Sequence, residues 1–240
     1  MTGHALIVGA GDYIGAAIAR RFAAGGFKVS LGRRNADQLV PLVTEISNRG
    51  GAAQGYALDA RDEETVERRF TQIEADHGPL DLVIFNVGGN VRFPITETTT
   101  RVYRKVWEMA CLGGFHTGRA AATRMVPRGR GAIFFTGASA SLRGNAGFAA
   151  FSSAKAALRS TAQSMARELG PKGIHVAHLV IDAGVDTQWV REIYANAGRE
   201  IAEGDLMNPA SVADAYWALY HQPPDAWTFE MDIRPHKETW

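Results

Sequence analysis

The sequence lacks the features that mark several classes of protein. Its 240 residues include one cysteine, Cys111, which excludes an internal disulfide and therefore a disulfide-stabilised secreted domain. The longest apolar runs have the length of strands, far short of the ~20 residues that span a bilayer. No basic segment followed by an apolar leader opens the chain. We therefore expect a cytoplasmic protein that does not bind membranes.

The sequence also lacks a large excess of charge of either sign. The 26 basic and 25 acidic side chains leave a net charge of +1, so no general positive field favours nucleic acid as a partner. No set of His, Cys, Asp and Glu has the spacing of a metal site, and we predict none. Hydrophobic residues make up 46% of the chain, as in a globular protein. Without a linker, repeat or low-complexity tract, residues 1–240 are predicted to form a single domain.

Short apolar runs alternate with longer amphipathic stretches along the whole chain. The runs predict strands at 5–8, 28–31, 52–58, 82–86, 132–136, 174–181 and 228–233. The stretches predict helices at 13–24, 36–48, 63–76, 99–125, 149–169, 187–196 and 209–220. Buried strands separated by helices are typical of parallel pairing with right-handed crossovers. The fold class is α/β, a Rossmann-like doubly wound parallel sheet of about seven strands with helices on both faces.

A glycine-rich turn lies between the first predicted strand and the first predicted helix. It reads Val-Gly-Ala-Gly-Asp-Tyr-Ile-Gly and places glycines at 9, 11 and 15. Glycines allow a tight turn and a close approach of phosphate, while the helix N-terminus offers free N–H groups. The alternative is a plain tight turn between strand and helix. The pattern predicts that a dinucleotide contacts Gly9, Gly11, Tyr13, Ile14 and Gly15.

Two arginines, Arg33 and Arg34, follow the second predicted strand. An acidic residue at this place binds the ribose 2′-hydroxyl of NAD, whereas a guanidinium matches the 2′-phosphate of NADP. We therefore predict NADP(H) as the cofactor in preference to NAD(H). The alternative is that the arginines are solvated, because Asp12 in the turn opposes a further phosphate charge.

Taken in order, these motifs resemble the short-chain dehydrogenase/reductase family over nearly the whole chain. Leu58-Asp59-Ala60 is similar to the family's adenine-contacting segment, and Asn86-Val87-Gly88-Gly89 to its Asn-Asn-Ala-Gly motif. The resemblance implies hydride transfer between NAD(P)H and a carbonyl or alcohol. It also implies cofactor contacts from Asp59, Ala60, Asn86, Gly88, Lys155 and Thr187.

The catalytic positions implied by the resemblance differ from the family pattern. The family moves its proton through a Tyr-x-x-x-Lys pair, which here reads Phe151 to Lys155. The family's serine corresponds to Ala138 and its relay asparagine to Cys111. Of four catalytic side chains only the lysine remains, and the middle glycine of the turn is Tyr13.

Other groups in the sequence can supply the proton. Lys155 shares a helical stripe with Phe148, Phe151 and Leu158, and apolar surroundings lower the pKa of an ammonium. A bulge at the strand end would bring Ser139 to the substrate oxygen, although hydrogen bonding in a turn is its alternative role. Asp182 ends the sixth predicted strand, where a carboxylate acts either as an acid or base or as a loop cap.

Three functions remain open on the sequence. The first is an NADP(H)-dependent oxidoreductase with a non-standard proton route, in which Lys155 and Ser139 are the catalytic candidates. The second is an inactive member that binds the dinucleotide as a sensor or structural ligand, and the third is a scaffold without cofactor.

The substrate is expected to be a small molecule, held under residues 187–209. The apolar lining candidates in that segment are Trp189, Val190, Ile193 and Tyr194. The resemblance further implies a homodimer or homotetramer that pairs through the helices predicted at 99–125 and 149–169.

Overall fold

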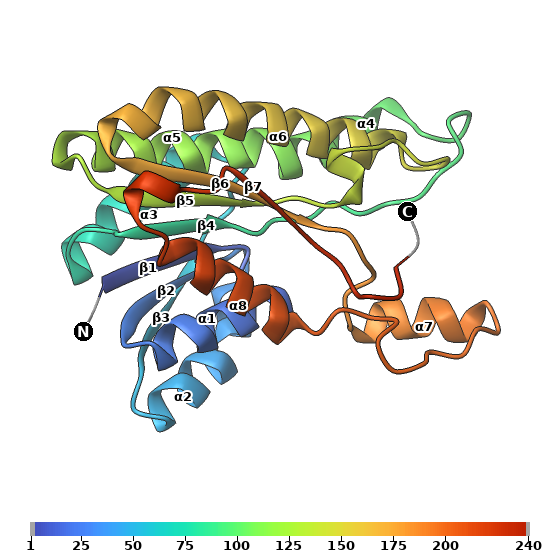
Figure 1. The fold of residues 1–240 in the computed structure, drawn as a ribbon, viewed down its shortest axis with the longest axis horizontal. Coiled ribbons are helices and arrows are strands. Elements are labelled where there is room, and N and C mark those ends of the chain that lie inside the picture. Colours follow the sequence, from blue (N-terminus) through green and yellow to red (C-terminus); the bar gives the residue numbers. More distant parts are fainter. Residues whose placement is uncertain (1–2, 239–240) are drawn as a thin grey trace.

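The apolar runs form one parallel seven-stranded sheet in the computed structural model, which describes residues 3–238 (Figure 1). The order is β3-β2-β1-β4-β5-β6-β7, as predicted for a doubly wound sheet. The strands are β1 (Gly3–Val8), β2 (Phe27–Arg33), β3 (Ala52–Ala57), β4 (Leu82–Phe85), β5 (Gly131–Thr136), β6 (Ile174–Ile181) and β7 (Glu230–Ile233).

Helices cover both faces of the sheet. One face packs against α1 (Ile14–Ala24), α2 (Val40–Asn48) and α8 (Pro209–Tyr220). The other packs against α3 (Glu63–His77), α5 (Gly113–Met125) and α6 (Ala149–Leu169). Helix α4 (Thr100–Trp107) contacts α6, and α7 (Gln188–Asn196) projects away from the sheet (Figure 1). Short helical turns complete the chain: η1 (Ala36–Leu39), η2 (Glu108–Leu112), η3 (Val126–Arg128), η4 (Ser139–Ser141), η5 (Gly170–Lys172) and η6 (Pro224–Ala226).

Strand β1 is the point at which the strand order reverses. It pairs with β2 on one side and with β4 on the other, and Val8 lies opposite Phe85 in the register with β4. The chain therefore leaves β1 and β4 side by side at their carboxyl ends. In open α/β sheets the crevice at such a point is the place for a ligand.

Two predicted helices are interrupted, each for a local reason. The helix expected at 99–125 consists of α4, a π-helical turn at η2 and α5. Just past the π-turn, a Cβ at Gly114 would lie 2.3 Å from Leu158, so the glycine allows α5 to approach α6 closely. The helix expected at 36–48 starts as the 3₁₀ turn η1, because Pro41 at the start of α2 lacks an N–H for a continuous helix.

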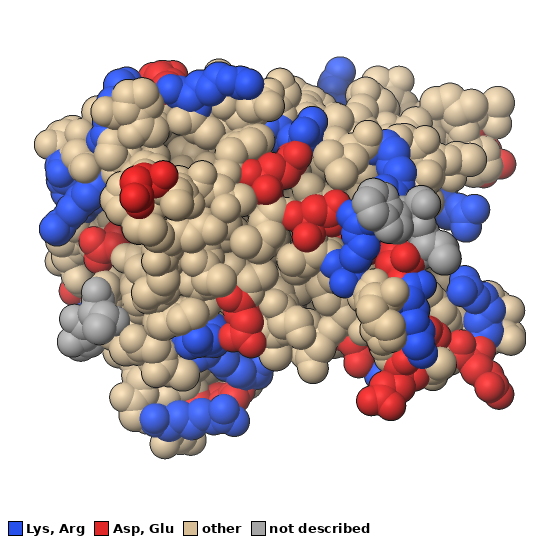
Figure 2. Space-filling model, viewed as in Figure 1, with Lys and Arg blue, Asp and Glu red and all other residues tan. Residues whose placement is uncertain are grey.

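Basic and acidic side chains are interspersed on the face shown in Figure 2, with no large patch of one sign. This distribution agrees with the near-zero net charge. Among residues 3–238, no helix is both long and apolar enough to cross a bilayer.

Phe22 connects three elements of the core on the α1 face. It is fully buried in α1, with ring centres 5.3 Å from both Phe27 of β2 and Trp217 of α8. Burial of one large aromatic ring against several elements is typical of a position that fixes a helix on a sheet.

We expect Phe22→Ala to lower the free energy of unfolding by about 3–5 kcal/mol, because it removes buried area and leaves a cavity. The matched control is Phe93→Ala, at a half-exposed loop position, which should change it by less than about 0.5 kcal/mol. Urea denaturation measures both variants. Equal stabilities for the two would contradict this role for Phe22.

Candidate functional site

The glycine turn after β1 forms one wall of the site. Gly9 has φ +87°, and a Cβ there would lie 2.7 Å from the carbonyl oxygen of Asn86. A Cβ at Gly15 would lie 2.7 Å from the backbone of Ala10, so this glycine lets α1 begin close to β1. At Gly11 a Cβ would meet nothing within 4 Å, which leaves the turn open to a ligand.

The first turn of α1 is available to an anion. Tyr13 at its N-cap makes no side-chain capping bond, and no acidic residue lies in the first turn. Its N–H groups therefore lack a side-chain partner, as in helices that bind phosphate. The phenol oxygen of Tyr13 instead accepts a 3.1 Å hydrogen bond from the backbone N–H of Gln188, the first residue of α7.

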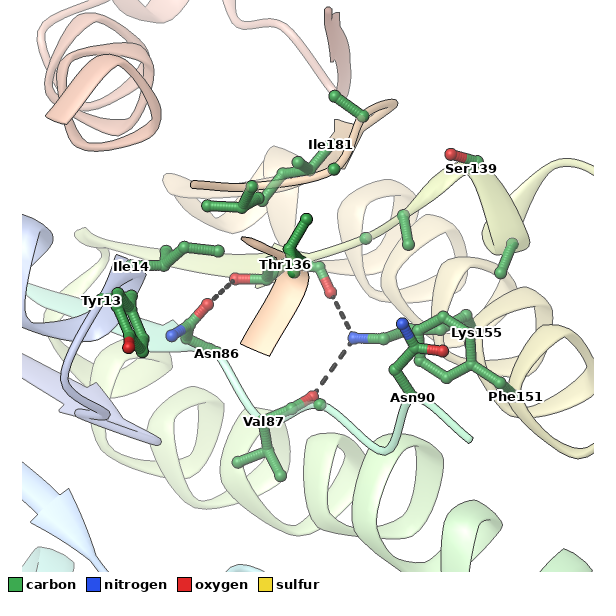
Figure 3. A pocket seen from close by; sticks show the side chains of 18 of the residues that line it. Tyr13, Ile14, Asn86, Val87, Asn90, Thr136, Ser139, Phe151, Lys155 and Ile181 are labelled. Carbon is green, nitrogen blue, oxygen red and sulfur yellow. Dashed lines mark hydrogen bonds between the residues drawn. The ribbon is translucent and has the colours of Figure 1, made fainter. Parts of the chain in front are cut away.

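Asn86 joins the ends of three strands. Its side-chain N–H donates to the carbonyl oxygen of Gly9 at 3.1 Å, and its Oδ1 accepts from the Thr136 hydroxyl at 3.0 Å (Figure 3). The Tyr216 hydroxyl lies 2.7 Å from Thr136 and extends this network into α8. The sequence interpretation included Asn86 but missed Thr136 and Tyr216. A polar residue at the end of the buried strand β5 was the available signal for Thr136.

Arg33 does not stand free at the end of β2. Its guanidinium pairs with Asp12 of the glycine turn, with nitrogen–oxygen distances of 2.7 and 3.4 Å. Arg34 is exposed. Both arginines line a small cavity of about 140 Å³ together with Asp59 and Ala60. The structure therefore brings these four predicted residues to one place, although Asp12 already engages Arg33.

Asp59 has a partner that the sequence interpretation missed. Arg61, two residues later, donates to both carboxylate oxygens, at 2.6 Å from NH2 to Oδ2 and 2.9 Å from Nε to Oδ1. These bonds lower the pKa of Asp59 below its ordinary value. The carboxylate is therefore held in place at the edge of the small cavity.

The main cavity has a volume of about 490 Å³ and shares Gly9, Val87 and Gly88 with the small one. Figure 3 shows Tyr13, Ile14 and Asn86 on one side of it and Lys155, Asn90 and Phe151 on the other. The two cavities thus meet at the carboxyl ends of β1 and β4. This layout gives one elongated site along the strand ends.

Lys155 is the buried cation of the main cavity. Its ammonium donates to the carbonyl oxygens of Thr136 at 2.8 Å and Val87 at 3.2 Å, and only 3% of the residue is exposed. Burial lowers its pKa from 10.5 to about 8. An ammonium has three N–H groups, so one remains for a ligand. This environment agrees with the predicted lowering.

The cavity wall near Lys155 carries two apolar side chains besides the polar Asn90. Phe151 lies one helical turn earlier, with its ring centre 6.0 Å from the ammonium nitrogen. Ala138 also lines the cavity. Neither side chain carries a hydroxyl. Cys111 is buried in the π-turn, where burial raises the pKa of its thiol, and it is not among the lining residues.

Ser139 lines the cavity, but not by way of a bulge. Strand β5 pairs regularly with β6 up to Thr136, and Ser139 begins the turn η4. Figure 3 shows the Ser139 side chain apart from Lys155 and Phe151. The structure therefore shows no bulge, and Ser139 lies on the cavity wall as the first residue of η4, while its catalytic role stays a prediction.

Helix α7 covers the cavity only with its first turn. Trp189 and Val190 line it, whereas Ile193 and Tyr194 do not, which corrects two of the four predicted lining residues. The Thr187 hydroxyl accepts from the N–H of Val190 at 3.1 Å and caps α7, and Thr187 does not line the main cavity. As an acceptor in this cap, the hydroxyl keeps its own O–H for another partner.

Asp182 does not face the cavity as the predicted acid or base would. Its carboxylate is buried and accepts a 2.8 Å hydrogen bond from Arg143, which does line the cavity. The sequence interpretation did not include Arg143. The two residues are 39 positions apart, and no local pattern relates them.

The known proteins that this chain resembles include several dehydrogenases. A family model described as short chain dehydrogenase matches residues 3–198. Gluconate 5-dehydrogenase of Gluconobacter oxydans is 30% identical over 173 residues, which are 72% of this chain and 68% of that protein. A short-chain dehydrogenase structure from Rhodopseudomonas palustris is 55% identical with a TM-score of 0.84, covering 97% of this chain and 98% of that chain. An alcohol dehydrogenase from Thermococcus sibiricus, complexed with 5-hydroxy-NADP, is 25% identical with a TM-score of 0.86, covering 99% and 98% of the two chains.

The lowered pKa of Lys155 predicts a pH dependence of stability. Between pH 8 and 10.5 the unfolded chain keeps the proton that the folded chain loses, so stability rises with pH over that window. Relative to Lys155→Met, the free energy of unfolding of the wild type should rise by up to about 3 kcal/mol. Denaturant titrations from pH 7 to 10.5 measure the difference, and parallel curves for the two proteins would contradict it.

Proposed function

The chain belongs to the short-chain dehydrogenase/reductase family, and from this premise we propose that it is an NADP(H)-dependent oxidoreductase with a non-standard proton route. It moves hydride between the nicotinamide and a small carbonyl or alcohol. The observation that carries the proposal is Lys155, a buried ammonium with a pKa of about 8 on the cavity wall. A group that titrates near neutrality suits general acid catalysis.

The residues of the elongated site fit a dinucleotide. Gly11 and Gly88 face open space, since a Cβ at either would meet no atom within 4 Å. The uncapped start of α1 suits the pyrophosphate, and the small cavity with Arg33, Arg34 and Asp59 suits the adenosine end. The relative from Thermococcus sibiricus, complexed with 5-hydroxy-NADP, supports the choice of cofactor class.

A nicotinamide dinucleotide supplies the hydride when it is bound. The protein holds the reacting groups and moves the proton. The carbonyl oxygens of Val87 and Thr136 hold the Lys155 ammonium from two sides and leave one N–H for the substrate oxygen. Phe151 and Ala138 exclude water from this place without competing for the proton.

A second function is favoured by one observation. Ala138 and Phe151 leave the cavity wall beside Lys155 without a hydroxyl, and a missing general acid lowers rates by ~10²–10⁴-fold. A protein of this kind binds the dinucleotide as a sensor or structural ligand and transfers no hydride. The scaffold without cofactor has less support, because the site residues fit a dinucleotide.

Nucleotide binding tests the cofactor assignment. We expect calorimetry to give a micromolar dissociation constant for NADPH and a constant at least about tenfold weaker for NADH. Arg33→Ala combined with Arg34→Ala should abolish the difference, since the guanidinium groups would bind the 2′-phosphate. Arg101→Ala, at an exposed position of α4, is the control. Equal binding of both nucleotides by the wild type would reject the preference, and no binding of either would reject both dinucleotide functions.

Turnover separates the oxidoreductase from the sensor. We expect the wild type to oxidise NADPH with a panel of small aldehydes and ketones, and Lys155→Met to lower the rate by at least ~10²-fold. If the wild type is inactive while Phe151→Tyr with Ala138→Ser is active, the sensor is the correct function. Because Lys155→Met also removes a polar contact of the site, NADPH affinity is measured beside the rate for every variant.

A further inference from the structure

Arg143 is a cationic residue of the main cavity wall that the sequence interpretation did not include. It follows η4 and lines the wall together with Asn145, Phe148 and Phe151. Its side chain is 39% exposed, so the guanidinium is not packed within the core and can be reached by a ligand. The dinucleotide functions proposed above assign no role to this residue.

A buried carboxylate fixes Arg143 in position. Asp182 is 1% exposed, and its Oδ1 accepts from NH2 of Arg143 at 2.8 Å. The other oxygen makes no hydrogen bond among the described residues, with Arg234 3.7 Å away as a second cation. Burial of a carboxylate costs free energy that only pairing offsets. The pairing therefore orients the guanidinium, and the backbone N–H of Asp182 anchors the acid to Ile233 of β7.

The Arg143 guanidinium has N–H donors that no other described residue uses, and a ligand could accept from them. Within residues 3–238, the bond to Asp182 is the one hydrogen bond of the Arg143 side chain. A guanidinium has five N–H groups in a planar fork, which matches the two oxygens of a carboxylate. One nitrogen of Arg143, NH2, is thus engaged by Asp182, and the remaining N–H donors are available to an anion in the cavity.

The charges on the cavity wall also favour an anion near Arg143. Lys155 and Arg143 are its cations, and the carboxylate among the described lining residues is Asp12 of the glycine turn, which pairs with Arg33. Asp182 lies near Arg234 as well as Arg143, and Arg234 in turn pairs with Asp232. The cavity wall also carries large apolar side chains, Phe148, Phe151 and Trp189, together with the uncharged polar Asn145. A hydrophobic wall with one oriented cation is suited to an organic acid.

We propose that Arg143, positioned by Asp182, binds a carboxylate of the substrate, so that the substrates are oxo acids or the matching hydroxy acids with an apolar body. That the substrate also carries a reacting carbonyl or hydroxyl group rests on the proposed oxidoreductase function. The anion site itself rests on the placement, pairing and free donors of Arg143.

Matched pairs of ligands test the proposal. Benzoylformate and 3-benzoylpropanoate are titrated against their carboxamides by calorimetry, with and without NADP⁺. We expect at least one acid to bind at least about tenfold more tightly than its amide, as for a charge-assisted hydrogen bond. Arg143→Ala should remove this preference. Arg191→Ala, which breaks the Arg–Asp pair with Asp186 outside the main cavity, should keep it.

Arg143→Ala leaves Asp182 buried without its partner and can unfold the protein. Arg143→Met combined with Asp182→Asn removes both charges and serves as the second variant. Equal binding of acid and amide by the wild type, no binding of any acid, or an acid preference that survives in the double variant would each overturn the proposal. Acid preference without NADPH binding rejects the oxidoreductase and keeps the anion site. NADPH binding without an acid preference rejects the anion site and keeps the proposed oxidoreductase function.

Discussion

The site depends on the hydrogen bonds of one amide side chain. Asn86 donates to Gly9 at the end of β1, accepts from Thr136 at the end of β5, and follows β4 itself. Parallel strands do not fix the loops that leave them, so the loops need a bond of their own. Thr136 connects this bond to two further groups, because its hydroxyl meets Tyr216 of α8 and its carbonyl oxygen accepts from Lys155. The glycine turn and the buried ammonium are therefore placed by one network.

The chemistry of the cavity follows from what surrounds the ammonium. Backbone carbonyl oxygens solvate Lys155 in place of a carboxylate, and burial holds its pKa near 8. A carboxylate partner would have stabilised the charged form and made the proton harder to give. The apolar neighbours Phe151 and Ala138 strengthen the effect, since they add no polar group to the wall. The same loss of hydroxyl groups accounts for both the oxidoreductase and the sensor as candidate functions.

The fold and the dinucleotide half of the site follow patterns that are local in the sequence. Apolar runs predict the strands to within a few residues, and a glycine turn between strand and helix predicts where phosphate can approach. Lys155 stands out because its helical stripe is otherwise apolar. The remaining features join residues that only folding brings together. Thr136 and Tyr216 are 80 positions apart, and Arg143 and Asp182 are 39 apart. The pairing of Arg33 with Asp12 also depends on the exact course of the turn. The π-turn before Gly113 and the close contact of Gly114 with Leu158 are likewise not visible in the periodicity.

The hydrogen bond from the Gln188 N–H to the Tyr13 hydroxyl joins α7 to the glycine turn, 175 positions away in the chain. No residue of α7 is buried, and the N–H of Gln188 is in the first turn, where a helix offers no partner of its own. One such bond is worth about 1 kcal/mol, which favours the position of α7 that makes it by roughly fivefold. The glycine turn thereby helps to hold the first turn of α7, with Trp189 and Val190, on the cavity wall. Under the proposed dinucleotide function, a cofactor that displaced the Tyr13 ring would remove this bond, and the position of α7 would then depend on the cofactor.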